Sequence, residues 1–122
     1  MYVEERVYRL LPGCIPAYFA LYEARGLVPQ SRYLDMMLGY YAAEIGALNE
    51  VVHLWLHRSL DERDARRAAM RADPDFAAYW EDVRGMIVEQ RTRILKPAPF
   101  FAGRLAAIAA VVSPGEAAAT AV

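Results

Sequence analysis

Two hydrophobic periods alternate along this chain, and the order in which they occur leaves few folds open to it. Short runs of apolar and aromatic residues with the character of β-strands lie at residues 2–11, 38–45, 50–57 and 88–95. Helical spacings of three and four residues separate the first two of these segments, and also the last two. The predicted order is therefore β-α-β-β-α-β, the signature of a ferredoxin-like sandwich in the α+β class.

Turn residues mark the boundaries between these segments. Pro12-Gly13 ends the first strand, and Pro16 suits the first position of the helix that follows. That helix is expected to break or shift over residues 26–29, where glycine and proline occur. Residues 46–49 form a short loop, so the second and third strands are predicted to pair as a hairpin.

The second helical region begins at Ser59 and Glu62, which have the spacing of a capping box, and restarts at Asp73-Pro74. Beyond the cap, one side of the helix carries alanines and the other carries mostly arginines. The two sets are Ala65, Ala68, Ala69 and Ala72, and Arg63, Arg66, Arg67 and Arg71. We interpret the arginine side as a solvent-exposed face rather than a ligand site.

Composition narrows the class of protein. A chain of 122 residues with 57% hydrophobic residues is expected to form one folded domain. A net charge of −1 gives no long-range attraction to nucleic acid or to an anionic membrane. The longest apolar run, residues 105–112, is far shorter than the roughly 20 residues that span a bilayer. Cys14 is the single cysteine, and acids stand where a signal peptide would be basic and apolar, so we expect a cytoplasmic protein.

The sequence holds no recognisable cofactor motif. It has no glycine-rich phosphate loop, nucleophile elbow or Cys–His arrangement. His53 and His57 lie about 13 Å apart along one predicted strand, too far to bind one metal ion together. We therefore expect neither a metal nor an organic cofactor.

Both faces of the third strand are apolar, which predicts a partner for the sheet. One face carries Val52, Leu54 and Leu56, and the other carries Val51, His53, Trp55 and His57. We expect the first set to face the helices and the second set to be left uncovered, because helices on one side of an antiparallel sheet bury only one face. The simplest cover is a second copy of the same sheet, so we predict a homodimer.

Several short motifs resemble the NIPSNAP family, and they occur in that family's order. They are Glu4 to Gly13 (EERVYRLLPG), Leu38-Gly39-Tyr40-Tyr41, Asn49 to Trp55 (NEVVHLW), Ser59-Leu60-Asp61 and Ile94 to Phe100 (ILKPAPF). The resemblance implies a dimeric α/β barrel, in which two ferredoxin-like units pair their sheets around an internal space. It implies no established reaction. We divide the chain into a NIPSNAP-like domain over residues 1–100 and an alanine-rich tail over residues 101–122, with a short helix at 103–112.

The barrel implied by this resemblance suggests a ligand site on its inner surface. Glu4, Arg6 and Tyr8 alternate on one face of the first strand, and we expect them to share the interior with His53 and Trp55. A guanidinium, an imidazole and a phenol together suit a small carboxylate or an aromatic acid. The alternative is that Glu4 and Arg6 pair with each other, or across the dimer, and only satisfy a polar lining.

Two classes of function follow from these features. A small-molecule-binding or protein-interaction module is favoured, because no acid–base pair can be identified from spacing. The alternative is a cofactor-independent enzyme, monooxygenase- or isomerase-like, that uses polar residues inside the barrel. Haem ligation by His53 would need a supporting motif, and the sequence has none.

Overall fold

The computed structural model describes residues 1–112 and contains the predicted α+β architecture. Its sheet has four antiparallel strands in the order β2-β3-β1-β4, which is the ferredoxin-like order. The strands are β1 (Tyr2–Leu10), β2 (Met37–Ala42), β3 (Glu50–His57) and β4 (Ile87–Leu95). All four predicted strands are present, and β3 has the predicted bounds. β2 ends earlier than expected, so the loop between β2 and β3 is longer than the short loop predicted over residues 46–49.

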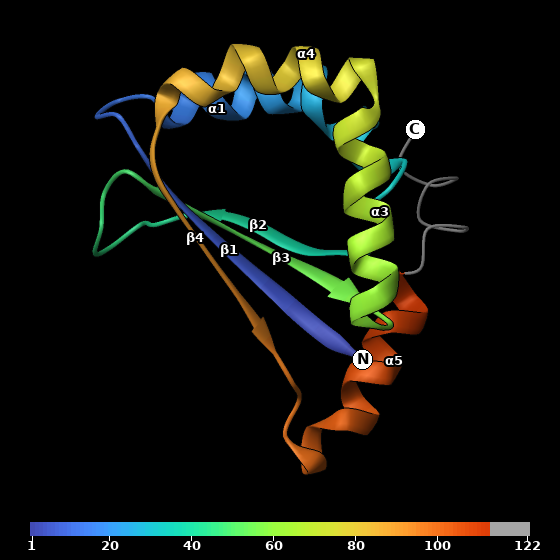
Figure 1. The fold of residues 1–122 in the computed structure, drawn as a ribbon. Coiled ribbons are helices and arrows are strands. Elements are labelled where there is room, and N and C mark those ends of the chain that lie inside the picture. The colour runs from blue at the N-terminus through green and yellow to red at the C-terminus, as the bar shows by residue number, and fades with distance from the viewer. Residues whose placement is uncertain (113–122) are drawn as a thin grey trace.

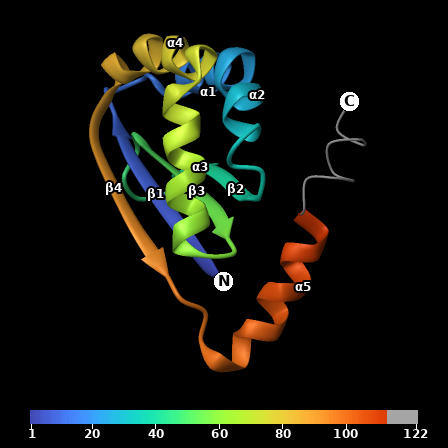
Figure 2. The ribbon, with the colours of Figure 1, turned by 45° about the vertical axis from the view of Figure 1, so that its right-hand side comes forward.

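Helices cover one face of this sheet and one end of the other. The helices are α1 (Ile15–Leu21), α2 (Leu27–Ser31), α3 (Leu60–Ala72), α4 (Pro74–Val83) and α5 (Ala102–Val112). Short 3-10 turns lie at Arg84–Met86 and Pro99–Phe101. Figures 1 and 2 show α1 and α4 side by side, α3 running along the strands, and α5 standing apart from the other helices. No helix among residues 1–112 is long and apolar enough to cross a membrane.

The expected shift in the first helical region is a π-helical turn at Tyr22–Gly26 that joins α1 to α2. Gly26 lies against α4 at this point. A Cβ atom added to it would come within 2.7 Å of the Tyr79 ring, so only glycine allows the two helices to approach this closely. Pro29 lies in α2, directly after the π-helical turn. Its nitrogen carries no hydrogen, so it cannot donate a hydrogen bond to the preceding turn.

The N-caps predicted for the second helical region are present at Ser59 and Asp73, whereas the Glu62 carboxylate pairs with Arg66 at 2.8 Å and does not complete the predicted capping box. The hydroxyl of Ser59 accepts a hydrogen bond from the backbone N–H of Glu62 at 3.0 Å. Asp73 separates α3 from α4 and accepts from the backbone N–H of Asp75 at 2.8 Å, with Pro74 at the first helical position.

The predicted orientation of α3 is wrong. The four alanines are exposed, whereas Arg67 and Met70 are buried against the sheet. Only Leu60 and Met70 are large apolar residues in this helix, so burying the alanine side would contribute little apolar area. The carboxylate of Glu4 instead accepts hydrogen bonds from Arg63, which directs the arginine side inward.

The predicted faces of the sheet are also wrong. His53 and Trp55, which were expected to face away from the helices, lie beneath them and are each 1% exposed. Tyr8, Leu10 and Val51 share this face with the aromatic residues of α1 and α4. Burying Trp55 removes more apolar area from water than burying a leucine, so the larger aromatic set is the one that the helices cover.

The helix expected within the tail is present as α5 and packs on the sheet. Leu105 and Ala109 are buried against Met36 and Leu56, in a cluster separate from the main core. Residues 113–122 of the expected tail lie outside the described residues. The division of the chain into a domain and a tail at residue 100 remains a prediction. Because α5 packs on Met36 and Leu56, removing the tail would also remove buried apolar residues.

Candidate functional site

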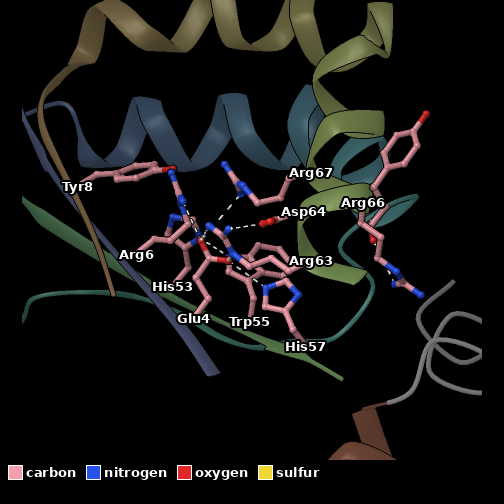
Figure 3. Close-up of polar contacts among 11 residues, drawn as sticks. Glu4, Arg6, Tyr8, His53, Trp55, His57, Arg63, Asp64, Arg66 and Arg67 are labelled. Carbon is pink, nitrogen blue, oxygen red and sulfur yellow. Dashed lines mark hydrogen bonds and ion pairs between the residues drawn. The ribbon is translucent and has the colours of Figure 1, made fainter. Parts of the chain in front are cut away.

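The carboxylate of Glu4 is the centre of a buried ionic cluster. Glu4 lies on β1 and is completely buried. Its Oε1 atom accepts hydrogen bonds from His57 Nε2 and from Arg63 Nε, both at 2.9 Å. Its Oε2 atom accepts from Arg6 Nη1 at 2.8 Å and from Arg63 Nη2 at 3.2 Å. Figure 3 shows the donors converging on Glu4 from β1, β3 and α3.

These donors keep Glu4 ionised. Burial by itself raises the pKa of the carboxyl, but hydrogen bonds from His57, Arg63 and Arg6 outweigh it and hold the pKa of Glu4 far below its usual range. One carboxylate cannot neutralise all the cations around it. Arg6, Arg63 and Arg67 are all within ion-pair distance of Glu4, and among residues 1–112 only Arg63 of these three has a second acid, the exposed Asp64. The cluster therefore has excess positive charge.

Arg67 is the least satisfied of these cations. Its Nη1 atom is 4.0 Å from Glu4 Oε2, at the limit of an ion pair, and its side chain is only 10% exposed. Its Nε atom is buried and has no hydrogen-bond partner among residues 1–112. Burial, together with the neighbouring charge of Arg6, lowers the pKa of Arg67 to about 10. A buried N–H of a charged group without an acceptor is costly, and it points to a missing acceptor.

A cavity of about 390 Å³ opens beside Arg67, between the helices and the sheet. This volume is at the lower end of the range for small-molecule sites. The cavity is lined from β1 by Arg6 and Tyr8, from β4 by Gln90, and from the helices by Gln30, Arg67, Met70, Arg71, Phe76, Ala77, Trp80 and Glu81.

The lining has an inner and an outer part. Five lining residues are buried: Tyr8, Gln30 and Arg67 form the floor, with Arg6 beside them, and Met70 and Phe76 form the inner walls. The remaining residues form the mouth: Arg71, Ala77, Glu81 and Gln90 are exposed, and Trp80 is half-buried. The cavity thus has a cationic floor, apolar aromatic walls and an opening to solvent. It is suited to a molecule with an acidic head and an apolar body.

Two of the five site residues predicted from the sequence line this cavity. Arg6 and Tyr8 do so and contact each other, since Arg6 Nε donates to the Tyr8 hydroxyl at 3.0 Å. Glu4 does not line the cavity, but its carboxylate accepts a hydrogen bond from Arg6 and so orients the Arg6 side chain. The predicted location inside a barrel between two sheets is wrong, because all of these side chains lie on the helix-covered face.

His53 and Trp55 lie deeper in the core than the cavity. Trp55 Nε1 donates to His53 Nδ1 at 2.6 Å, so the imidazole carries its proton on Nε2. The ring stacks on Tyr40 with centroids 4.5 Å apart and meets the edge of Tyr8 at 4.9 Å. Burial, with a smaller effect of the Arg6 charge, lowers the pKa of His53 to about 3, so the ring is neutral at physiological pH.

Sequence reasoning missed the residues that α3 and α4 contribute, above all Arg67 and Trp80. A signal for Arg67 was available. A helix with two large apolar residues in 13 must turn polar side chains toward the sheet, and Arg63 and Arg67 are separated by one turn. Gln90 had no such signal, since nothing in the sequence of a solvent-exposed edge strand marks one glutamine as part of a cavity.

Fold and site together define a small α+β protein with a ferredoxin-like sheet and a cationic cavity between that sheet and its helices. The chain belongs to the NIPSNAP family, whose sequence profile matches residues 3–102. This confirms the resemblance seen in the sequence. No curated protein matches the chain.

Solved structures of bacterial NIPSNAP proteins are similar to this one. Protein Atu4242 of Agrobacterium tumefaciens, described as having unknown function, is 42% identical with a TM-score of 0.80, over 82% of this chain and 96% of that one. An uncharacterised NIPSNAP-like domain protein of Burkholderia xenovorans is 35% identical with a TM-score of 0.78, over 81% of this chain and 86% of that one. No specific biochemical role is established by these relatives.

A more distant structure has the same fold. It is an antibiotic biosynthesis monooxygenase, 15% identical with a TM-score of 0.58, and the match covers 81% of this chain and 100% of that one. At this identity the likeness concerns the fold alone.

Proposed function

We propose that this protein binds a small organic anion in the cavity between α3, α4 and the sheet. The observation that carries the proposal is the Nε–H of Arg67, which is buried on the floor of that cavity and has no acceptor in the part of the chain that the structure describes. An acceptor oxygen from a bound carboxylate would complete its hydrogen bonding and offset the excess positive charge of the Glu4 cluster.

The candidate site residues take different roles in this proposal. Arg6, Tyr8 and Arg67 contact the ligand, because they line the floor. Glu4 is a positioning residue that holds Arg6 and Arg63 in place. His53 and Trp55 support Tyr8 from the core, through the edge contact between the Tyr8 and His53 rings.

The test compares an acid with a neutral molecule of the same body. We expect 3-phenylpropanoate to bind and 3-phenylpropan-1-ol to bind at least tenfold more weakly, measured by isothermal titration calorimetry. Arg67→Met should weaken 3-phenylpropanoate by roughly 10- to 150-fold, the equivalent of about 1.5–3 kcal/mol for a hydrogen bond to a charged group. The matched control is Arg58→Met, which removes an exposed arginine outside the cavity that pairs with Glu62 at 3.6 Å. Equal binding of acid and alcohol, or equal affinities in the two variants, would overturn the proposal.

We also propose that the protein is a homodimer that pairs the face of the sheet away from α1–α4. Val7, Val52 and Leu54 lie on that face. Ion pairs border them, Arg93 to Glu5 at 2.8 Å and Arg91 to Glu50 at 3.1 Å. An apolar centre with a charged border is the usual anatomy of an interface. A cytoplasmic location is part of the same proposal, supported by a composition with one cysteine.

The second candidate function is a cofactor-independent enzyme, and one observation favours it. The Tyr8 hydroxyl lies on the cavity floor and accepts a hydrogen bond from Arg6 Nε at 3.0 Å, so its own hydrogen is directed to another acceptor and could be transferred to a bound substrate. Phenylpyruvate in D₂O tests this candidate, because its C3 hydrogens are exchangeable. Exchange faster than the background in the native protein and lost in Tyr8→Phe would support an enzyme, whereas binding without faster exchange would favour the binding protein.

A further inference from the structure

The groups on the cavity floor that remain free for a ligand are all hydrogen-bond donors. The acceptor oxygens nearby each accept at least one hydrogen bond already. Both oxygens of Glu4 accept from arginines, and one also accepts from His57. The Gln30 Oε1 atom accepts from the hydroxyl of Tyr22. The Tyr8 oxygen accepts from Arg6 Nε.

Donors on three floor residues are left once these bonds are counted. They are the guanidinium N–H groups of Arg67, the hydroxyl hydrogen of Tyr8 and the side-chain NH₂ of Gln30. Among residues 1–112 no acceptor is assigned to any of them. They come from three elements, α3, β1 and α2, so they approach the floor from different directions. One carboxylate cannot accept hydrogen bonds from all of these donors. A second acceptor atom next to the carboxylate would accept from a donor that the carboxylate does not reach.

We infer that the floor recognises a 2-oxo acid with an aromatic body, the carboxylate on Arg67 and the adjacent oxo oxygen on Tyr8. This inference rests on the proposed function and names the ligand class for the same cavity. A 2-oxo acid presents only acceptor atoms at its head, as the donors on the floor require. A 2-amino acid would place an ammonium group against the guanidiniums of Arg6 and Arg67, and a 2-hydroxy acid would bring a hydroxyl hydrogen to a floor whose oxygens already accept other hydrogen bonds.

The walls select the body of the molecule. Met70 and Phe76 flank the floor, and Trp80 lies above it at the mouth, where its ring is half-buried. A single aromatic ring linked to the head by one carbon fits between them, since aromatic rings prefer offset or edge contacts with neighbouring rings. A cavity of about 390 Å³ has room for one such molecule.

Four acids with the same aromatic body test the inference. They are phenylpyruvate, 3-phenyllactate, phenylalanine and 3-phenylpropanoate, which differ only at the carbon beside the carboxylate. We expect phenylpyruvate to bind about three- to tenfold more tightly than 3-phenylpropanoate, the fold-change that one neutral hydrogen bond gives. Phenylalanine should bind most weakly. Equal binding of phenylpyruvate and 3-phenylpropanoate would overturn the inference and leave the proposed function standing, whereas failure of all four acids to bind would overturn both.

Tyr8→Phe identifies the donor responsible. This variant should lose the preference and bind phenylpyruvate and 3-phenylpropanoate with equal affinity. Tyr41→Phe, which removes an exposed hydroxyl away from the cavity, should keep the native preference. A preference retained in Tyr8→Phe would contradict the assignment. A measurement on the native protein guards against misfolding of the variant: the ¹³C resonance of the C2 carbonyl of labelled phenylpyruvate should move downfield on binding, and an unchanged shift would overturn the inference.

Discussion

Arg67 Nη1 lies 4.0 Å from Glu4 Oε2, whereas Arg6 Nη1 reaches the same oxygen at 2.8 Å. Arg67 is thus held beside a carboxylate that is already fully hydrogen-bonded. A carboxylate so occupied cannot satisfy a third guanidinium, which remains available to another anion. The fold therefore maintains a buried cation next to a cavity, where a hydrophobic residue would have been the simpler choice for stability.

Glu4 should be critical for folding. Glu4→Gln removes the charge that balances Arg6, Arg63 and Arg67, and we expect it to lower the free energy of unfolding by about 3–5 kcal/mol, as for other broken buried ion pairs. Glu5→Gln is the matched control, because Glu5 is the next residue of β1, faces the other way and pairs with the exposed Arg93. That change should cost less than about 1 kcal/mol. Urea unfolding measures both, and similar losses in the two variants would contradict the central role of Glu4.

Stability should fall as the pH falls below neutrality because of His53. Its folded-state pKa is lowered to about 3, below the usual value of 6.5, so between these values the unfolded chain binds a proton that the folded protein does not. This contribution is complete above pH 6.5 and is lost on acidification. From pH 7 to pH 5 it amounts to roughly 2 kcal/mol.

The variant His53→Gln isolates this effect, since it removes the titrating ring. Urea unfolding at several pH values between 5 and 7 should show a shallower pH dependence in the variant than in the native protein. The range stays above pH 5 so that carboxylates remain ionised in both states. The same slope in both proteins would show that His53 is not the group responsible.

Dimerisation should depend on Leu54 and folding on Trp55, although the two residues are neighbours on β3. Leu54→Asp places a charge on the face proposed to meet a second copy, and should give a folded monomer by sedimentation velocity at micromolar concentration. Trp55→Asp places the charge in the main core and should abolish the folded far-UV circular dichroism spectrum. A native protein that sediments as a monomer would remove the proposed homodimer.

Removal of residues 101–122 should leave the sheet and α1–α4 folded. Among the described residues 1–112, the main core contains none beyond Ile87, so truncation after Phe100 keeps every one of these core residues. The loss of Leu105 from its site against Met36 and Leu56 should still cost about 1.5–3 kcal/mol. We expect a cooperative thermal transition at a lower temperature. Loss of the cooperative transition would show that α5 is an essential part of the fold.

The sequence by itself determined the elements and their order. Alternation along residues 50–57, the caps at Ser59 and Asp73, and the turn at Pro12-Gly13 are local signals, because each depends on the backbone preferences of neighbouring residues. They place the strands and helices within a few residues and, with the NIPSNAP motifs, give the fold. Arg6 and Tyr8 were identified as neighbours for the same reason, since strand alternation puts residues two apart on one face.

Only the tertiary structure decided which face of each element is buried. β3 is apolar on both faces, so its sequence does not show which face the helices cover. In the structure the aromatic residues of α1 and α4 cover Trp55 rather than Leu54. The same holds for α3, where the attraction of Arg63 to a carboxylate 59 residues away outweighs the burial of small alanines. Such choices depend on charges and side-chain volumes brought together from distant parts of the chain, which no local pattern contains.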